Sequence, residues 1–331
     1  MKTLYKYYSN KLDVKKHLAN PSIKLATTAS LNDPFEKQLS YQMTKTLSEI
    51  MLGKKNENEN AMQKERLIQA LSGAYTNVSK SFGVVSLTET HENLLMWAHY
   101  AASHKGYCIG YNDDLFDELY KVNHNDDKWC GIYKPEKINY NSKRFQKDDI
   151  DINSNENSLI LKAMLKKSID WAYEFEHRSI IPFYLADRFT IPEDSEEDSA
   201  LTRKIKRDER HKIINKSTES FGYENILPKS NAAYTHIMEN YAGIEGVVMF
   251  KDINLKSINS IFIGSQVDEK EANEIANLIN SNKEKYGHIS VYKYNTHRND
   301  FKIYITGLAN AKIPNNIENE LIETNLCGFE L

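Results

Sequence analysis

The sequence predicts an α+β fold in which small mixed and antiparallel sheets pack with helices. Short segments of alternating apolar and polar residues recur along the chain, as expected of strands with one buried face. Between them lie longer segments with apolar residues at helical spacing, such as 159–171. No internal repeat and no shift in composition marks a boundary. We therefore expect a single domain over residues 1–331, with helical insertions at about 39–80 and 200–241.

The N-terminal quarter is predicted to alternate strands with amphipathic helices. Alternating aromatic residues indicate the first strand, and apolar residues on one face indicate the helices. In order, we predict a strand at 4–8, a helix at 12–19 that ends before Asn20-Pro21, a strand at 23–26, a loop at 27–36, and helices at 39–52 and 61–79 on either side of a polar segment.

The segment 82–112 is predicted to fold as strand, helix and strand. Val84, Val85 and Leu87 form the first strand, and Asn93 can cap a helix that runs from Leu94 to about Ser103. A second strand follows Gly106 at 107–111. Because the helix is so apolar (LLMWAHYAA), it must be largely buried, and its polar atoms must be paired or line a pocket.

The remaining elements follow from the same patterns. Strict alternation in YEFEHRSII predicts a strand, and clean alternation recurs near the C-terminus. We predict helices at 113–122, 159–171, 200–218, 232–241 and 269–285, and strands at 130–140 with a kink at Pro135, 173–181, 246–250, 257–263, 289–294 and 301–305.

Composition excludes several classes of protein. The formal net charge of −3 argues against nucleic-acid binding driven by net charge, although it is compatible with binding through a local basic groove. Three distant cysteines are typical of reduced thiols, and neither a signal peptide nor an apolar run of membrane length is present, which predicts a cytoplasmic protein without membrane contact. The sequence has no metal-binding or dinucleotide-binding motif, no P-loop and no nucleophile elbow, so we expect no metal and no tightly bound cofactor.

Glu174 and Glu176 are the candidate catalytic pair. On a strand they share one face with Arg178, roughly 6–7 Å apart at their Cα atoms. A carboxylate under a ribose can bond the 2′-hydroxyl and stabilise the oxocarbenium-like cation that forms as an N-glycosidic bond breaks. Because Arg178 can keep Glu176 ionised, we expect Glu176→Gln to abolish activity with little loss of stability. The alternative is a solvated strand face with a Glu–Arg ladder.

Two further groups are candidates for ligand contacts. Trp97 can stack on a nicotinamide or a nucleobase, although His99 lies roughly 160° from it around the helix axis. Plain core packing is the alternative for both residues. The turn at 31–36 offers Asn32 and Asp33 as rigid donors and acceptors, but Asp33, Pro34 and Glu36 also fit an ordinary helix start with a capping box.

Basic side chains gather in three places. Lys143-Arg144 and Lys166-Lys167 are pairs, and the third cluster lies in a predicted helix that could present a cationic stripe to phosphates. The alternative is a solvated helix with internal ion pairs. The nucleic-acid-binding candidates are Arg203, Lys204, Lys206 and Arg207.

Several sequence blocks resemble a bacterial family of unknown function, domain of unknown function 2971. The blocks are LYKYYS, LNDPFE, VVSLTE with NLLMWAHYAASHKGYCIGY, WAYEFEHR and IFIGSQV, and they span nearly the whole chain. The resemblance implies a role in phage defence. The layout also resembles, at the level of the fold, an ADP-ribosyltransferase core.

We therefore expect a phage-defence enzyme that cleaves an N-glycosidic bond, with ADP-ribosyl transfer from NAD as the favoured reaction. The alternatives are a DNA glycosylase that excises a nucleobase, including a modified one from phage DNA, and a non-catalytic phage or nucleotide sensor. The expected partner is a nucleotide or nucleic acid, and the oligomeric state is open. The catalytic candidates are Glu176, Glu174 and Asp33, and the substrate-binding candidates are Tyr5, Tyr7, Asn32, Glu36, Ser86, Trp97, His99, Tyr100 and Arg178.

Overall fold

The structure is a computed structural model that describes residues 2–37, 39–52, 61–119, 131–146, 149, 156–191, 200–214, 223–227, 232–244 and 246–311. It confirms a mixed α+β class with several small sheets. The chain divides into two compact units, each assembled from segments that are distant in sequence. Unit 1 comprises Met1–Pro21, Thr88–Leu115 and Asn254–Leu331, and unit 2 comprises Ser22–Leu87 and Phe116–Ile253. The prediction that the whole chain forms one domain stays a prediction.

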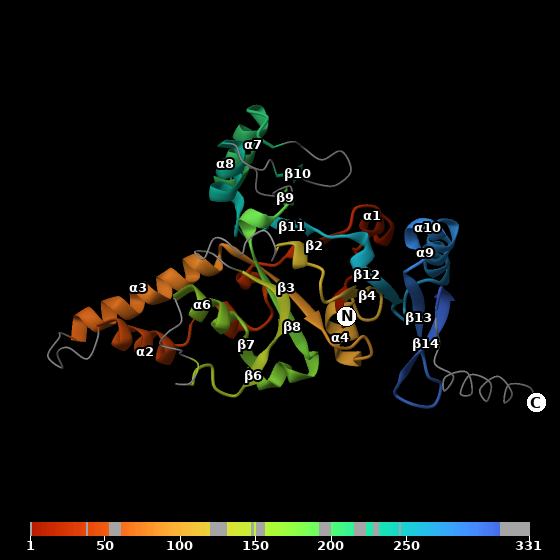
Figure 1. Cartoon of the computed structure of the whole chain (residues 1–331), viewed down its shortest axis with the longest axis horizontal. Coiled ribbons are helices and arrows are strands. Elements are labelled where there is room, and N and C mark those ends of the chain that lie inside the picture. The colour runs from red at the N-terminus through yellow and green to blue at the C-terminus, as the bar shows by residue number, and fades with distance from the viewer. Residues whose placement is uncertain are drawn as a thin grey trace, which may run out of the picture. The chain divides into compact units, whose positions relative to one another are not determined.

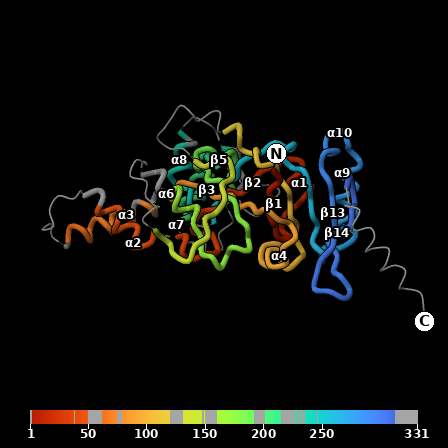
Figure 2. The backbone as a smooth tube through the Cα atoms, turned by 60° about the horizontal axis from the view of Figure 1, so that its bottom comes forward, coloured from red at the N-terminus to blue at the C-terminus, as the bar shows by residue number. Residues whose placement is uncertain are grey.

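The sheet of unit 1 joins the N-terminal strand to the C-terminal strands. Its order is β14-β13-β12-β4-β1, and its neighbours are antiparallel except for the parallel pair β12 and β13. Figures 1 and 2 show β13 and β14 side by side. The strands are β1 (Thr3–Tyr8), β4 (Tyr107–Asn112), β12 (Ile258–Ile263), β13 (Ser290–Thr296) and β14 (Ile303–Ala309).

Helices connect these strands at points that the sequence marks. Between β12 and β13, α9 (Glu269–Ser281) buries Ala272, Ile275, Ala276 and Ile279, which recur at the three- and four-residue spacing of one helix face. Asn282 ends α9 and caps α10 (Lys283–Tyr286), so the single helix predicted at 269–285 is two helices. The other helices of unit 1 are α1 (Val14–Ala19), α4 (Leu94–Tyr100) and the 3₁₀ turn η6 (Leu255–Ser257).

Helix α4 begins where predicted but ends earlier. The Asn93 side chain accepts hydrogen bonds from the N–H groups of Leu95 and Met96, at 2.9 and 3.3 Å. The helix stops at Tyr100 instead of Ser103 because Ala102, Ser103 and His104 adopt left-handed φ values of 49, 55 and 67°. The backbone at Gly264 packs closely against this segment, since a Cβ at Gly264 would lie 2.1 Å from the carbonyl oxygen of His104.

Unit 2 contains three groups of strands. They are ordered β3-β8-β5, β10-β9-β11-β2 and β6-β7, with the last pair parallel. Strand β3 belongs to unit 2 up to Leu87, and its last residue, Thr88, belongs to unit 1. The strands are β2 (Ser22–Leu25), β3 (Phe82–Thr88), β5 (Ile132–Lys137), β6 (Asn139–Asn141), β7 (Lys166–Ser168), β8 (Glu176–Pro182), β9 (Arg188–Ile191), β10 (Tyr223–Ile226) and β11 (Val248–Asp252).

The helices of unit 2 pack an apolar core beside β3 and β8. Figures 1 and 2 show α2 and α3 side by side, and Lys64 on α3 forms a 2.7 Å ion pair with Glu49 on α2. Leu39, Met43, Tyr75, Phe82, Val84, Ile138, Phe145, Leu161, Met164, Leu165 and Ile180 form the core. The helices are η1 (Thr28–Ser30), η2 (Pro34–Lys37), α2 (Tyr41–Leu52), α3 (Ala61–Ser79), α6 (Glu156–Met164), η4 (Ile169–Glu174), η5 (Phe183–Leu185), α7 (Ala200–Arg210) and α8 (Ala232–Tyr241).

Two predicted elements in unit 2 are wrong in a way that matters for the site. The helix predicted at 159–171 ends at Met164 and is followed by β7 and by η4, which Ser168 caps by accepting a hydrogen bond from the N–H of Asp170. The strand predicted at 173–181 begins only at Glu176, because Phe175 adopts a left-handed conformation with φ 45° and ψ 45°.

Other boundaries differ by a few residues. The segment predicted as one strand at 130–140 forms β5 and β6, with a register irregularity between Ile132 and Glu136 around Pro135. Strand β14 begins at Ile303 instead of Phe301, and α7 ends at Arg210. The predicted insertion at 200–241 also contains β10. Cys130, the end of the helix predicted at 113–122 and residues 215–218 lie outside the described residues.

Candidate functional site

The turn at η2 places two carboxyl groups in the interior of unit 2. Asp33 precedes the turn, and its Oδ1 accepts a 2.9 Å hydrogen bond from the N–H of Phe35, which confirms the predicted cap. The predicted capping box does not form, because Glu36 bonds Arg178 instead. Asp33 is only 1% exposed, and the Glu36 side chain is 6% exposed. Glu36 accepts a short hydrogen bond through Oε1 from the Arg178 guanidinium. Asp33 Oδ2 and Glu36 Oε2 are buried without a hydrogen-bond partner.

Glu174 and Glu176 meet at a lysine instead of lying on one strand face. Lys167 on β7 donates to Glu174 Oε2 at 2.5 Å and to Glu176 Oε2 at 3.0 Å. Arg178 donates from Nε to Glu176 Oε1 at 2.7 Å and from Nη1 to the carbonyl oxygen of Met164 at 2.7 Å. We call Glu36, Lys167, Glu174, Glu176 and Arg178 the ion cluster. Its four residues other than Glu36 are at most 8% exposed, which contradicts the alternative of a solvated strand face.

The pKa values of two carboxyl groups in the ion cluster, Glu176 and Glu36, are shifted in opposite directions. Burial alone would raise the pKa of Glu176, but the charges of Arg178 and Lys167 outweigh it and lower that pKa to about 2. Burial raises the pKa of Glu36, against the opposing charge of Arg178. Burial would lower the pKa of Lys167, but Glu176 and Glu174 raise it. Glu176 is therefore firmly ionised, whereas Glu36 binds a proton more readily than an ordinary carboxyl group.

The low pKa of Glu176 predicts a loss of stability in acid. Because the folded-state pKa lies below the ordinary value of 4.5, the stabilisation is present above pH 4.5 and is lost as the pH falls towards 2. The shift from 4.5 to about 2 corresponds to about 3 kcal/mol. We expect urea unfolding between pH 6 and pH 2.5 to show this loss in the wild type and a flatter dependence in Glu176→Gln. Parallel curves for the two proteins would contradict the assignment.

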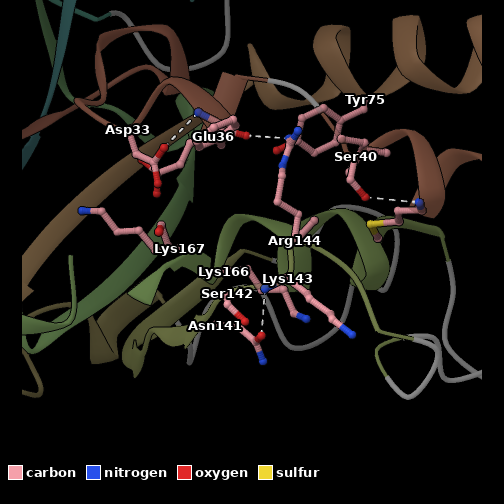
Figure 3. A pocket seen from close by; sticks show the side chains of 15 residues that line it. Asp33, Glu36, Ser40, Tyr75, Asn141, Ser142, Lys143, Arg144, Lys166 and Lys167 are labelled. Carbon is pink, nitrogen blue, oxygen red and sulfur yellow. Dashed lines mark hydrogen bonds between the residues drawn. The ribbon is translucent and has the colours of Figure 1, made fainter. Parts of the chain in front are cut away.

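A pocket of about 220 Å³ opens beside these groups (Figure 3). Asp33 and Glu36 lie on one side, and Asn141, Ser142 and Lys143 lie on the opposite side. Arg144 donates to the carbonyl oxygen of Phe35 at 2.8 Å, and its guanidinium lies 5.3 Å from the centre of the Phe35 ring. The other lining residues are Phe35, Leu39, Ser40, Met43, Tyr75, Ala163, Lys166, Lys167 and Ser168.

The pocket thus combines acidic and basic groups in separate places. The carboxylate oxygens of Asp33 and Glu36 can accept hydrogen bonds from hydroxyl or amine groups. Lys143, Arg144 and Lys166 can bind an anion such as a phosphate, although Lys166 also pairs with Asp149. A ligand with sugar hydroxyls at one end and a phosphate at the other fits this arrangement of charge.

The structure brings together most of the candidates that lie in unit 2. Ser86 supplies a hydrogen bond that helps to lower the pKa of Glu176. Asn32 is exposed in the segment that precedes η2. Sequence reasoning assigned Lys167 to a basic pair for phosphates, whereas it lies inside the ion cluster. It missed Tyr140, whose hydroxyl accepts a 2.8 Å hydrogen bond from the N–H of Glu176, and Tyr75, which lines the pocket.

The aromatic candidates belong to unit 1. Trp97 is 0% exposed, and its Nε1 donates to the carbonyl oxygen of His91 at 2.8 Å. Its ring packs against Tyr7 and Tyr294, so the structure agrees with the alternative of a core tryptophan. His99 is exposed, which contradicts a buried histidine. The aromatic candidates of unit 1 are Tyr5, Tyr7, Trp97, His99 and Tyr100, and the prediction that they share a cleft with residues of unit 2 stays a prediction.

Helix α7 carries the basic candidates, and part of its charge is used within unit 2. Lys204 donates to the carbonyl oxygen of Asn240 at 3.1 Å and lies over the Tyr241 ring. Arg207 pairs with Asp208 at 3.0 Å. Arg203 and Lys206 are exposed. These contacts fit the alternative of a solvated helix with internal pairs, and the predicted nucleic-acid contact stays a prediction.

The sequence predicts no metal site and no membrane span, and the structure can be searched for both only within the described residues. In that part of the chain, no three His, Cys, Asp or Glu side chains are grouped in a way that could hold a metal ion. None of the helices described there combines the length and hydrophobicity of a membrane span. Cys108 is buried and unpaired, whereas Cys130 and Cys327 lie outside the described residues.

Comparison with known proteins matches one family. Residues 96–179 match the family described as "Protein of unknown function (DUF2971)", a stretch that includes α4 from Met96 onward, Lys167, Glu174, Glu176 and Arg178. Asp33 and Glu36 lie outside that stretch. No curated protein and no solved structure matches the chain. The central stretch of the chain, where two of the sequence blocks lie, is therefore similar to the DUF2971 family of proteins of unknown function.

Proposed function

We propose that the pocket of unit 2 binds a nucleotide and that the protein cleaves its N-glycosidic bond, with ADP-ribosyl transfer from NAD as the favoured reaction. The observation that carries the proposal is a pair of buried carboxylate oxygens without partners, Asp33 Oδ2 and Glu36 Oε2, on two residues of a pocket that basic side chains also line. Leaving such oxygens buried and unpaired is costly. A ligand with hydrogen-bond donors, such as a ribose, would offset that cost.

The proposed chemistry divides the roles of the carboxyl groups. When the bond between the anomeric carbon and the nicotinamide nitrogen breaks, the nitrogen keeps the electron pair and positive charge develops at the carbon. Asp33 would hold a ribose hydroxyl and stabilise this charge electrostatically. The attacking atom of the acceptor then bonds to the anomeric carbon and loses its proton. Glu36 would accept that proton, because its raised pKa makes it a stronger base than an ordinary carboxylate.

Glu176 takes a different role in this proposal from the one that the sequence suggested. Both of its carboxylate oxygens are engaged by Lys167 and Arg178, and it is not among the residues that line the pocket. Its charge holds Arg178, which in turn donates to Glu36. Glu174 likewise holds Lys167, which lines the pocket. We therefore assign Glu174 and Glu176 to positioning.

The size of the pocket limits what enters it. Ligand pockets commonly have volumes of about 300–1,000 Å³, and this one has about 220 Å³. One end of a dinucleotide would enter, with its sugar towards Asp33 and Glu36 and a phosphate towards Lys143 and Arg144. The rest of NAD would remain outside the pocket.

The test supplies the purified protein with NAD and, separately, with plain and phage-modified DNA. Release of nicotinamide with transfer of ADP-ribose would support the favoured reaction. Abasic sites in DNA would instead support the glycosylase alternative. Glu239→Gln removes an exposed carboxylate on α8 and serves as the matched control. Absence of both products, together with absence of nucleotide binding, would overturn the proposal.

A role in phage defence is part of the proposal, and the family resemblance is its support. Phage should form fewer plaques on cells that carry the wild-type gene than on cells that carry the Asp33→Asn variant. Equal protection by the two proteins would contradict an enzymatic role in defence and favour a non-catalytic sensor.

A further inference from the structure

Tyr75 is a buried residue of the pocket in unit 2 that the proposed reaction does not use. It lies on α3, where Ile68 and Ser79 share its buried face at helical spacing. The residue is 3% exposed and belongs to the apolar core of unit 2, yet it also lines the pocket (Figure 3). The core therefore fixes the position of the ring at the wall of the pocket.

The charges around Tyr75 locate its hydroxyl group. Burial raises the pKa of Tyr75 to about 12, and the charge of Glu36 adds to the rise. The charges of Arg178 and Arg144 act in the opposite direction. Because these charges act on the phenol oxygen, the hydroxyl lies near Glu36 and Arg144, which both line the pocket. At neutral pH the hydroxyl keeps its proton, so it is a neutral hydrogen-bond donor and not a base.

This hydroxyl is not used by the fold. Within the part of the chain that the structure describes, the Tyr75 hydroxyl forms no hydrogen bond. Its charged neighbours are engaged elsewhere: Glu36 accepts from Arg178, and Arg144 donates to the carbonyl oxygen of Phe35 at 2.8 Å. Buried tyrosine hydroxyls usually find a hydrogen-bond partner. An unpaired one at the wall of a pocket therefore indicates that a ligand supplies the partner.

The surroundings of the hydroxyl indicate which ligand group it contacts. Glu36 lies on one side of it and attracts hydrogen-bond donors, whereas Arg144 attracts an anion. The Tyr75 hydroxyl has a proton to donate, so the ligand group between it and Arg144 must accept hydrogen bonds. A phosphate meets both requirements, because its oxygens accept hydrogen bonds and it carries the negative charge that a guanidinium binds.

We propose that Tyr75 is the residue that makes this pocket specific for a phosphorylated sugar, with its hydroxyl donating to a phosphate oxygen that Arg144 also binds. The inference rests on the proposed function, which places the sugar at Asp33 and Glu36. Tyr75 takes part in no bond-making or bond-breaking step. It distinguishes a sugar phosphate, such as the ribose phosphate of a nucleotide, from a sugar without phosphate.

The test compares two ligands that differ by one phosphate and two proteins that differ by one hydroxyl. Calorimetric titration of the full chain uses ribose 5-phosphate and ribose, and we expect the wild type to bind ribose 5-phosphate at least tenfold more tightly. Tyr75→Phe should weaken the binding of ribose 5-phosphate by about 10- to 100-fold, because it removes a hydrogen bond to a charged group. Its affinity for ribose should be unchanged. The matched control Tyr41→Phe, which removes an exposed hydroxyl on α2, should change neither affinity.

Urea unfolding separates this role of Tyr75 from a structural one. Because the hydroxyl forms no hydrogen bond within the described residues, Tyr75→Phe without ligand should unfold at the same urea concentration as the wild type or at a higher one. Unfolding at a clearly lower concentration, or failure to fold, would show that the hydroxyl supports the fold and would overturn the proposal.

The binding data can also overturn the proposal. Equal affinities of the wild type for the two ligands, absence of binding at 10 mM (about the weakest affinity that calorimetry can measure), or unchanged binding of ribose 5-phosphate by Tyr75→Phe would each do so. An equal loss for both ligands would place Tyr75 at the sugar and contradict the phosphate contact. Nicotinamide release without a Tyr75-dependent phosphate contact would overturn this inference alone. Tyr75-dependent binding of ribose 5-phosphate without any reaction product would leave the inference standing without the proposed reaction.

Discussion

Asp33→Asn is expected to reduce nicotinamide release from NAD by about 10²–10³-fold. The asparagine keeps the shape of the side chain and can keep the hydrogen bond from the N–H of Phe35, which Oδ1 accepts. It removes the negative charge at Oδ2, the buried oxygen without a partner that the proposed reaction uses. The measurement is the initial rate of nicotinamide release at saturating NAD.

Stability separates a catalytic role of Asp33 from a structural one. Because Asp33 is buried and its Oδ2 has no partner, removal of the charge should leave the free energy of unfolding unchanged or increase it. Glu239→Gln should change neither quantity. A variant that releases nicotinamide at the wild-type rate would contradict the role of Asp33, and a variant that loses activity only in proportion to unfolded protein would show that Asp33 acts on folding alone.

Glu176→Gln is expected to lower the free energy of unfolding by about 3–5 kcal/mol. Glu176 accepts from Lys167 and twice from Arg178, and all three side chains are buried. Removing one charge from such a group leaves the partner cations undercompensated in a largely buried region. This expectation replaces the small effect that the sequence alone suggested, because an exposed pair would contribute only about 0–1 kcal/mol.

Urea unfolding at pH 7 measures this effect directly. The matched control is Glu49→Gln, which breaks the ion pair with Lys64 between α2 and α3, where both side chains are more than a third exposed. We expect the control to cost less than about 1 kcal/mol. A similarly small cost for Glu176→Gln would mean that the ion cluster contributes no more than a surface pair.

The sequence was most informative where local rules decide the structure. The Asn93 cap, the helix start at Asp33-Pro34, and the apolar alternation of β12 and β13 are local signals, and each appears where predicted. The close association of Glu176 and Arg178 also followed from their spacing on one strand. In such places neighbouring residues alone determine the conformation.

Other features depend on contacts between distant segments. Strict alternation in YEFEHRSII predicted a strand from Tyr173, but the left-handed Phe175 breaks the pattern there. Nothing in the local sequence indicated that Lys167 would be buried between two glutamates, because a Lys-Lys pair is usually solvated. Trp97, expected at a ligand, is enclosed by Tyr7 and Tyr294, which come from β1 and β13. The pocket at Asp33 and Glu36 likewise needs segments near residues 75, 141 and 167.

The most direct test of the account is a crystal structure of the protein with ADP-ribose, the part of NAD that remains after nicotinamide leaves. We predict that the terminal ribose occupies the pocket of unit 2, with a hydroxyl within hydrogen-bond distance of Asp33 Oδ2 or Glu36 Oε2 and a phosphate beside Lys143 or Arg144. Density for ADP-ribose at another site, or an empty pocket at millimolar ligand, would contradict the central claim that these two carboxylates hold a nucleotide sugar.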